Sequence, residues 1–197
     1  EQVFIGGFST GGALAVHHLL NHPDSAQGLL LFSGALRLTS TAESMAGIWG
    51  MKTIAAWLDG EYLTDGPNPY KYPKVASYSA LVLMDVIKEV RALLKDNTVA
   101  KPIFAAHSLA DLTTLYEGIE NLLNTMPGDH TEFKIDESFG VCHADLVLSS
   151  TQLMGLNFDE SQVNPLELCA TPHANPLHRS MLQVLDNYLQ QHTQALD

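Results

Sequence analysis

The residues most capable of chemistry lie near the start of the chain, where Gly7-Phe8-Ser9-Thr10-Gly11 form a G-x-S-x-G pattern. An apolar run of strand type, residues 3–5, precedes them, and apolar residues at helical spacing follow. A serine in a sharp turn between a strand and a helix needs neighbours without side chains, because the strand and the helix must approach closely. We expect Ser9 to project its hydroxyl above a sheet, where the N–H of Thr10 and the positive end of the helix dipole would bind a developing oxyanion.

A glycine-rich turn without chemistry, or one that cradles a phosphate, is the alternative interpretation of these residues. The segment has neither a Walker-type lysine nor the G-x-G-x-x-G spacing, which disfavours the phosphate version. The purely structural version stays open at this point, since the pentapeptide alone does not distinguish a nucleophile from a turn.

A serine hydroxyl is a poor nucleophile unless a base accepts its proton, so the hypothesis requires a histidine and an acid that orients it. Residues 102–111 supply a short strand, a loop and the carboxylate of Asp111. Residues 138–145 follow a later strand and contain His143. Because the carboxyl ends of parallel strands meet at one edge of a sheet, we expect Asp111 and His143 at the edge where Ser9 lies.

Other carboxylates and one other histidine compete for these roles. Asp129 and Asp136 flank a strand on the wrong side or in the wrong phase, and Asp145 is a further carboxylate near the later strands, so Asp111 is the preferred acid. His107 lies near the same edge and could line a pocket, although a loop histidine satisfied by a backbone carbonyl is the favoured interpretation.

Two histidines and two cysteines are further candidates for a metal site or a reactive thiol. His18 and His22 are spaced i,i+4 on a helix and could in principle bind a metal, but no third ligand is in view and we interpret them as solvent-facing. Cys142 and Cys169 are too few for a disulfide framework, although a single disulfide stays open. Cys142 would be reactive if its thiolate were stabilised, but a small buried filler is the favoured interpretation.

Strands and helices alternate along the chain, which predicts βαβ crossovers, an α/β fold and a mostly parallel sheet with helices on both faces. The run 28–34 is continuously apolar, as is typical of a strand buried on both faces. Further strands are expected at 3–5, 102–106 and 131–135, and helices at 13–20, 78–94, 112–126 and 177–192.

Composition indicates a folded protein of one domain, residues 1–197, with 46% hydrophobic and 16% charged residues. Ten Lys and Arg against 22 acids give a formal charge of −12, which disfavours nucleic acids and anionic lipid surfaces as partners. No apolar stretch of about 18 residues occurs, so no membrane span is predicted. The chain opens as EQVFIGG, without an initiator Met, and any signal peptide would lie upstream, so the compartment stays open.

The segments GFSTGG, PIFAAHSLAD and GVCHADLVL resemble, in this order, the nucleophile, acid and histidine blocks of the α/β-hydrolase superfamily, especially of its esterase, lipase and monoacylglycerol-lipase-like branch. The resemblance implies that Ser9 is the nucleophile, His143 the general base and then acid, Asp111 the orienting carboxylate, and Thr10 an oxyanion donor. Neither a cofactor nor a metal is implied. Cys142 departs from the pattern, because a glycine or a small polar residue is expected before the histidine.

The resemblance spans nearly all of the chain and is vague only at 39–74, where the family places a variable cap. Apolar residues at helical spacing there indicate a helical, cap-like insertion followed by a linker: Ile48, Met51, Ala55, Leu58 and Tyr62. Four neighbouring apolar residues could form a lid over an acyl chain or belong to an ordinary core, with a slight preference for the lid: Trp49, Met51, Ile54 and Trp57.

The activity that the resemblance implies is hydrolysis of a small-molecule ester or lipid through an acyl-enzyme. Amide or peptide hydrolysis, acyl transfer, and a catalytically silent binding module are the alternatives. The family also has strands before the nucleophile strand, and a loop there that donates a second oxyanion N–H. We therefore expect this chain alone to be a weak catalyst or none, and its N-terminal strand to pair with an upstream segment, a separate chain or a second copy.

Overall fold

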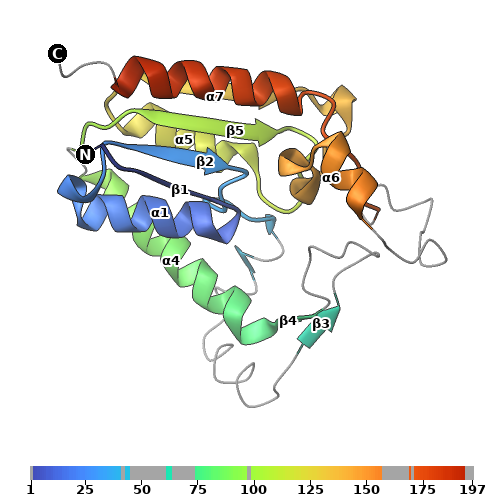
Figure 1. Ribbon diagram of the computed structural model, residues 1–197. Coiled ribbons are helices and arrows are strands. Elements are labelled where there is room, and N and C mark those ends of the chain that lie inside the picture. The colour runs from blue at the N-terminus through green and yellow to red at the C-terminus, as the bar shows by residue number, and fades with distance from the viewer. Residues whose placement is uncertain are drawn as a thin grey trace.

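A parallel sheet of four strands forms the centre of the fold (Figure 1). In the computed structural model the described residues are 2–40, 43–44, 61–63, 74–96, 99–156, 169 and 171–193. The strands run in the order β1-β2-β5-β6, with β1 Phe4–Phe8, β2 Gly28–Phe32, β5 Ile103–Ser108 and β6 His130–Ile135. All three neighbouring pairs are parallel, so the predicted α/β fold with a parallel sheet is confirmed.

Helices cover both faces of this sheet. In Figure 1, α7 (His178–Thr193) lies above the sheet, and α1 (Thr10–Asn21) and α4 (Ser77–Lys95) lie below it. The arrows of β1, β2 and β5 end on the same side, toward the short helix α6 (Ser150–Gly155). Side chains that follow the ends of these strands are therefore brought to one edge of the sheet.

The two faces have separate apolar cores, and β5 contributes to both because side chains of a strand alternate between its faces. Ile103 and Ala105 pack with α1, α4 and α5 (Tyr116–Thr125) on one face. Phe104 and Ala106 pack with α7 on the other, where Tyr188 is buried against Phe104. All six residues of β5 are buried, which makes this strand a rigid support for the loop that follows it.

Helix α5 begins at Tyr116, later than the 112–126 expected from apolar spacing. Leu115 is extended, with φ −89° and ψ 135°, and its N–H donates to Arg37 O at 2.9 Å. Thr114 also forms an isolated bridge with Leu38. The loop after β5 therefore extends to Leu115, and the other predicted helices and strands agree with the structure within a few residues.

The predicted cap-like insertion at 39–74 lies mostly outside the described residues, Trp49, Met51, Ile54 and Trp57 included. The described part includes two short antiparallel strands, β3 Glu61–Leu63 and β4 Lys74–Ala76. Tyr62, which was expected on a helical stripe, lies in β3, since its backbone pairs with Val75.

Strand β1 is one of the two edge strands of the sheet in the described residues, and β6 is the other. Ser9 N–H donates to Phe32 O, and Gln27 N–H donates to Val3 O, so alternate residues of β1 face β2. The backbone groups of Phe4, Gly6 and Phe8 consequently point away from β2, where no strand among the described residues pairs with them. The pairing of this edge with another segment stays a prediction.

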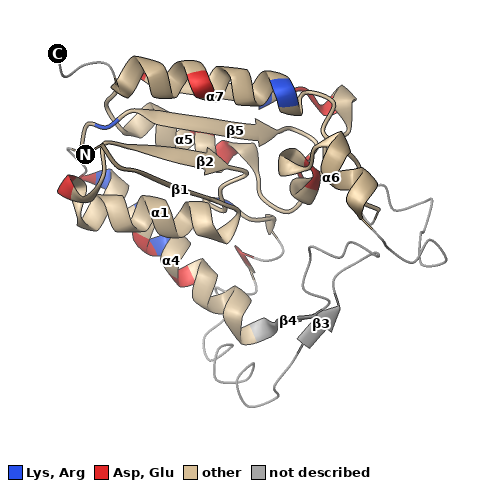
Figure 2. Cartoon of the chain, viewed as in Figure 1, with Lys and Arg blue, Asp and Glu red and all other residues tan. Residues whose placement is uncertain are grey.

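Charged residues on the described part are mixed in sign. Figure 2 shows both acidic and basic residues along α4, whose sequence includes Asp85, Lys88 and Glu89. None of the helices in the described ranges is both long and apolar enough to cross a membrane.

Candidate active site

Ser9 occupies the turn between β1 and α1, with φ 55° and ψ −121°. A positive φ is rare for a residue other than glycine and costs energy, so the surrounding structure must hold it. Ser9 N–H donates to Phe32 O at 3.0 Å, and Ser9 O accepts from the N–H of Ala35 at 2.9 Å and of Gly12 at 3.0 Å. Bonds to the neighbouring strand and to the helix thus fix the serine on both sides of the turn.

The glycines around Ser9 differ in what they contribute. A Cβ on Gly7 would lie 2.4 Å from the backbone of Gly11, and a Cβ on Gly12 would lie 2.9 Å from Gly34 Cα. A Cβ on Gly11 would meet nothing within 4 Å. A residue without a side chain is therefore needed at Gly7 and Gly12, and not at Gly11 as the motif suggests. The Gly11 backbone is the group that a Cβ on Gly7 would strike.

His143 lies at the start of a 3₁₀ turn, His143–Val147, on the connection that follows β6. Its Nε2 lies 2.8 Å from Ser9 Oγ and its Nδ1 lies 2.6 Å from Asp111 Oδ2. An ionised carboxylate only accepts, so Nδ1 carries the hydrogen and the lone pair of Nε2 faces the serine hydroxyl. The ring of Phe8 lies 4.7 Å from the imidazole and the His143 side chain is only 12% exposed, which limits its movement.

Asp111 is 3% exposed and lies in the loop after β5. Its Oδ1 accepts from the N–H groups of Thr113 at 2.8 Å and Thr114 at 3.0 Å. Its Oδ2 accepts from His143 Nδ1 and from Thr114 Oγ1, the latter at 2.8 Å. Burial raises the pKa of Asp111, but the hydrogen bonds from His143 and Thr114 outweigh it and hold the pKa below its ordinary value of 3.8. The carboxylate is therefore ionised at neutral pH.

The structure thus brings Ser9, His143 and Asp111 within hydrogen-bond distance, and Thr10, whose N–H is the expected oxyanion donor, is the first residue of α1. A first helical residue has no intrahelical acceptor for its N–H, so this donor suits an incoming oxygen. The competing carboxylates bind other groups: Asp145 the N–H of His173, Asp136 the N–H of Ser138, and Asp129 the amide of Gln191.

His107 lies on β5 itself and not on a loop, and is 1% exposed. Its Nε2–H donates to the backbone carbonyl of Thr114 at 3.1 Å, the kind of partner expected from the sequence. Burial lowers the pKa of His107, so the ring is neutral at neutral pH. The histidine supports the loop that carries Asp111, and its Nε2 stays 3.9 Å from the Asp111 carboxylate.

His18 and His22 are exposed at the end of α1, with ring centroids 4.9 Å apart. The described ranges contain no group of three or more His, Cys, Asp or Glu side chains arranged to hold a metal.

Cys142 forms a disulfide with Cys169, so the single disulfide that the sequence left open is present and the favoured interpretation of Cys142 as a small buried filler is wrong. The partners are 27 residues apart in sequence, and their Cα atoms lie 5.4 Å apart. Sequence spacing alone does not reveal such a pairing, because it depends on how the chain returns after α6. The disulfide ties the residue directly before His143 to a distant part of the chain.

Two residues of the site, Thr114 and Ser33, were not predicted from the sequence. Thr114 donates to both oxygens of Asp111, and Ser33, at the end of β2, is buried with φ 44° and offers its carbonyl to Thr114 Oγ1. The signal for Thr114 was its place three residues after Asp111, where an aspartate side chain commonly accepts backbone N–H groups in a turn. No comparable signal marks Ser33.

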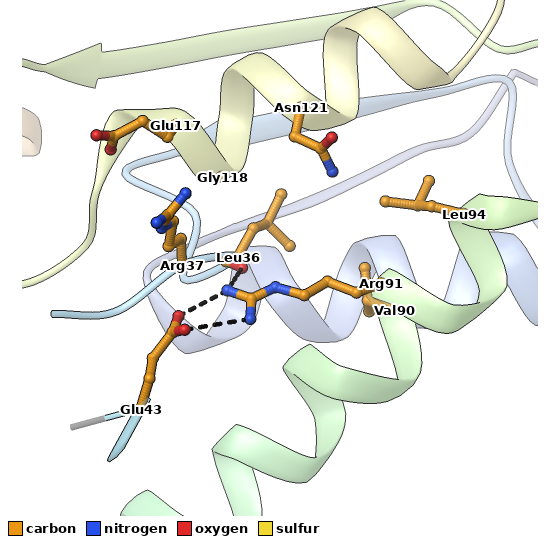
Figure 3. Close-up of a pocket in the computed structure, with 9 residues that line it drawn as sticks. All are labelled: Leu36, Arg37, Glu43, Val90, Arg91, Leu94, Glu117, Gly118 and Asn121. Atoms are coloured by element: carbon orange, nitrogen blue, oxygen red, sulfur yellow. Dashed lines mark hydrogen bonds and ion pairs between the residues drawn. The ribbon is translucent and has the colours of Figure 1, made fainter. Parts of the chain in front are cut away.

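A separate pocket of about 340 Å³ lies between α4, α5 and the segment after β2, and Figure 3 shows its lining. Arg91 crosses it, donating to Glu43 at 2.7 Å and to the carbonyl of Leu36 at 3.1 Å. The bond from Arg91 holds the pKa of Glu43 below its ordinary value. This ion pair anchors the segment that leaves β2 for the predicted cap-like insertion, and neither Ser9, Asp111 nor His143 lines the pocket.

Comparisons with known proteins agree with this architecture. Residues 1–57 match the model of the phospholipase/carboxylesterase family, whereas no curated protein matches the chain. The monoacylglycerol lipase of Paleococcus ferrophilus superposes with a TM-score of 0.61 at 15% identity, over 98% of this chain and 70% of that one. A structure described with LipS and LipT, two metagenome-derived lipolytic enzymes, gives 0.59 at 18% identity, over 94% and 66%.

A soluble variant of monoglyceride lipase from Saccharomyces cerevisiae gives a TM-score of 0.56 at 15% identity, over 95% of this chain and 62% of that one. The chain therefore spans about two thirds of the length of the solved structures that it matches. Similarity to structures of such low sequence identity shows the fold alone. The family model matches the N-terminal segment, which contains Ser9. The chain therefore has the α/β-hydrolase fold of these structures, and its first 57 residues match the phospholipase/carboxylesterase family model.

Proposed function

We propose that this chain carries the catalytic residues of a serine hydrolase that cleaves carboxylic esters through an acyl-enzyme. One observation carries the proposal: His143 bridges Ser9 and Asp111, with 2.8 Å from Nε2 to the serine hydroxyl and 2.6 Å from Nδ1 to the carboxylate. Nucleophile, base and orienting acid then form one connected system, as covalent catalysis by a serine requires.

In the acylation step, Ser9 Oγ attacks the ester carbonyl carbon while His143 Nε2 takes the hydroxyl proton. The oxyanion of the tetrahedral intermediate forms next to the N–H of Thr10, at the positive end of α1. When the intermediate collapses, the imidazolium of His143 gives its proton to the departing alkoxide, and the acyl group stays on Ser9.

In the deacylation step, a water molecule replaces the alcohol. His143 takes one proton from this water as its oxygen attacks the acyl carbon, and then returns the proton to Ser9 Oγ as the carboxylic acid leaves. Asp111 keeps its negative charge throughout, and stabilises the imidazolium that forms in both steps.

The substrate class that we propose is a neutral ester or lipid. The formal charge of −12 disfavours strongly anionic substrates, because the field of the whole protein slows their approach. The structures similar to this chain include monoacylglycerol lipases, whose substrates are uncharged, and this supports the same class. The insertion at 39–74 is proposed as a cap over the acyl group.

Amide hydrolysis and acyl transfer use the same three residues, because the triad does not select the leaving group or the acceptor. They differ from ester hydrolysis in the products: an amine from an amide substrate, or an ester of an added alcohol. A silent binding module would keep the turn at Ser9 without reacting there.

The test is covalent labelling of the complete protein by a fluorophosphonate, together with hydrolysis of p-nitrophenyl esters of increasing chain length. Ser9→Ala should abolish both labelling and hydrolysis. Ser25→Ala, which changes an exposed serine of the same chain, should preserve both. Labelling that persists at another residue in Ser9→Ala would refute the assignment, and an unlabelled native protein would favour the silent module.

A further inference from the structure

The hydroxyl of Thr114 lies in the centre of the site, between the carboxylate and the imidazole. Thr114 is 1% exposed, and its Oγ1 lies 2.8 Å from Asp111 Oδ2, 3.3 Å from His143 Nδ1 and 3.3 Å from Ser33 O. No part of the proposed chemistry uses this hydroxyl, so its position needs another explanation.

The direction of its hydrogen follows from its neighbours. Asp111 Oδ2 and Ser33 O can only accept, and His143 Nδ1 directs its own hydrogen toward Oδ2. The hydroxyl therefore donates to Asp111 Oδ2, the nearest acceptor, with Ser33 O as the more distant one. Oδ2 then receives hydrogens from both Thr114 and His143.

Thr114 holds the carboxylate by both oxygens, because its backbone N–H donates to Oδ1 at 3.0 Å and its hydroxyl to Oδ2 at 2.8 Å. The χ2 torsion of an aspartate is broad, so a single hydrogen bond does not define the plane of its carboxylate. Two donors from one residue fix that plane, and with it the direction in which Oδ2 receives the imidazole N–H.

The backbone of Thr114 is itself held by two further contacts. Its carbonyl accepts from the buried Nε2–H of His107 at 3.1 Å, and its backbone forms the isolated bridge with Leu38. A β-branched side chain also has few χ1 rotamers, so the hydroxyl stays where the backbone places it.

We propose that Thr114 is a positioning residue for the hydrolysis, which acts through Asp111 to hold His143 in line with Ser9. This inference rests on the proposed function. Thr114 touches neither substrate nor the reacting atoms, so it should affect the rate of the chemical step and leave substrate binding unchanged.

The first test is Thr114→Val in the complete protein, assayed on a p-nitrophenyl ester. The change keeps the β-branch and removes the hydroxyl, so a hydrogen bond to a charged group is lost. We expect kcat to fall about 10- to 100-fold while KM changes less than about twofold. Thr114→Ser keeps a hydroxyl and should restore most of the rate. Thr125→Val makes the same replacement at a half-buried position of α5, outside the site, and should leave kcat and KM unchanged.

Unchanged kcat in Thr114→Val, an equal loss in Thr114→Ser, or a rise in KM alone would overturn the positioning role. If thermal unfolding shows that Thr114→Val does not fold, Thr114→Ala against Thr114→Ser makes the same comparison with smaller side chains. The Ser9→Ala variant is treated with the fluorophosphonate in parallel. Persistent labelling of that variant would overturn both proposals, whereas full activity of Thr114→Val beside an unlabelled Ser9→Ala would overturn the role of Thr114 alone.

Discussion

At the scale of single residues, the backbone of Ser9 depends on how closely β1 and α1 approach each other. Ser9 adopts φ 55°, and a Cβ on Gly7 would lie 2.4 Å from the Gly11 backbone. The same replacement at Gly11 meets open space. Two glycines of one sequence motif therefore differ in their tolerance of a methyl group.

Gly7→Ala should destabilise the protein by about 1–3 kcal/mol, because an inserted methyl group in a packed region forces the backbone to shift. It should also reduce labelling of Ser9, since the shift occurs in the turn that positions the hydroxyl. Gly11→Ala should leave stability unchanged or raise it by about 0.5–1 kcal/mol, as alanine in a helix does. Urea unfolding measures the stability of each variant, and fluorophosphonate labelling measures the reactivity of Ser9. Equal losses of stability and labelling in Gly7→Ala and Gly11→Ala would contradict the predicted difference between the two glycines.

Asp111 predicts how stability depends on acid. Its folded pKa lies below the ordinary value of 3.8, so its contribution is complete above that pH. As the pH falls from there through the lower folded pKa, the unfolded chain binds the proton first and the contribution is lost. His107 and His143 face the same carboxylate, and the lowered pKa of His107 causes a separate loss that begins below its ordinary value of 6.5.

The free energy of unfolding, measured in urea between pH 3 and pH 7, should therefore fall in two steps. Asp111→Asn has no proton to bind at this position, so the lower step should become shallower while the upper one persists. Identical slopes below pH 4 in the two proteins would show that Asp111 is not held ionised by its partners.

The positions of Ser9, Asp111 and His143 were predictable because each follows a strand, and parallel strands place such residues at one edge. Thr114 was not, since its contribution depends on a turn whose geometry sequence spacing only suggests. Apolar spacing even placed it inside a helix from 112 to 126, whereas Thr114 bridges Leu38 and the N–H of Leu115 donates to Arg37 O, so this stretch pairs with a neighbouring segment.

At the scale of elements, the connection that carries His143 is fastened at two points. The disulfide Cys142–Cys169 holds the residue before it, and Asp145 in the same 3₁₀ turn accepts from the N–H of His173. Both fastenings come from the part of the chain that follows α6. The strand before this connection, β6, and the helix after it, α7, were predicted within a few residues from apolar spacing, but a covalent link across 27 residues has no such pattern.

Replacing both cysteines by serine should lower stability by about 3–4 kcal/mol, since a disulfide that closes a loop of this length restricts the unfolded chain by about that amount. Ester hydrolysis should also decrease, because His143 directly follows Cys142. A reducing agent should have the same effect on the native protein and none on the double variant, as thermal unfolding with and without dithiothreitol would show. Two titratable thiols in the unreduced native protein would contradict the disulfide.

At the scale of the whole molecule, helices cover both faces of the sheet, and β1 is one of its two edge strands in the described residues. The chain spans about two thirds of the length of the similar solved structures. The α/β class was predictable from the alternation of apolar runs and amphipathic helices. The cap-like insertion at 39–74 stays a prediction, because most of it lies outside the described residues, and its described part includes two short strands that helical spacing did not indicate.

The open edge predicts a pattern of amide exchange. Ile5 and Gly7 face β2, whereas the N–H groups of Phe4, Gly6 and Phe8 point outward. In a dilute solution of the 1–197 chain, the outward amides should exchange with solvent faster than the inward ones, since only the inward ones are bonded. A partner strand supplied by an upstream segment or a second copy would bond the outward groups, as exposed edges tend to do.

Hydrogen exchange followed by NMR at increasing chain concentration tests this pairing. Protection of the three outward amides that rises with concentration, together with a doubled mass by light scattering, would indicate pairing of two copies through β1. Protection that appears only in a longer chain carrying an upstream segment would indicate pairing with that segment. The amides of Leu29 and Leu31 in β2, which lies between β1 and β5, serve as the internal control and should stay protected throughout. Fast exchange of the outward amides in every sample would contradict the predicted pairing, because an edge that remains solvated in the complete protein has no partner strand.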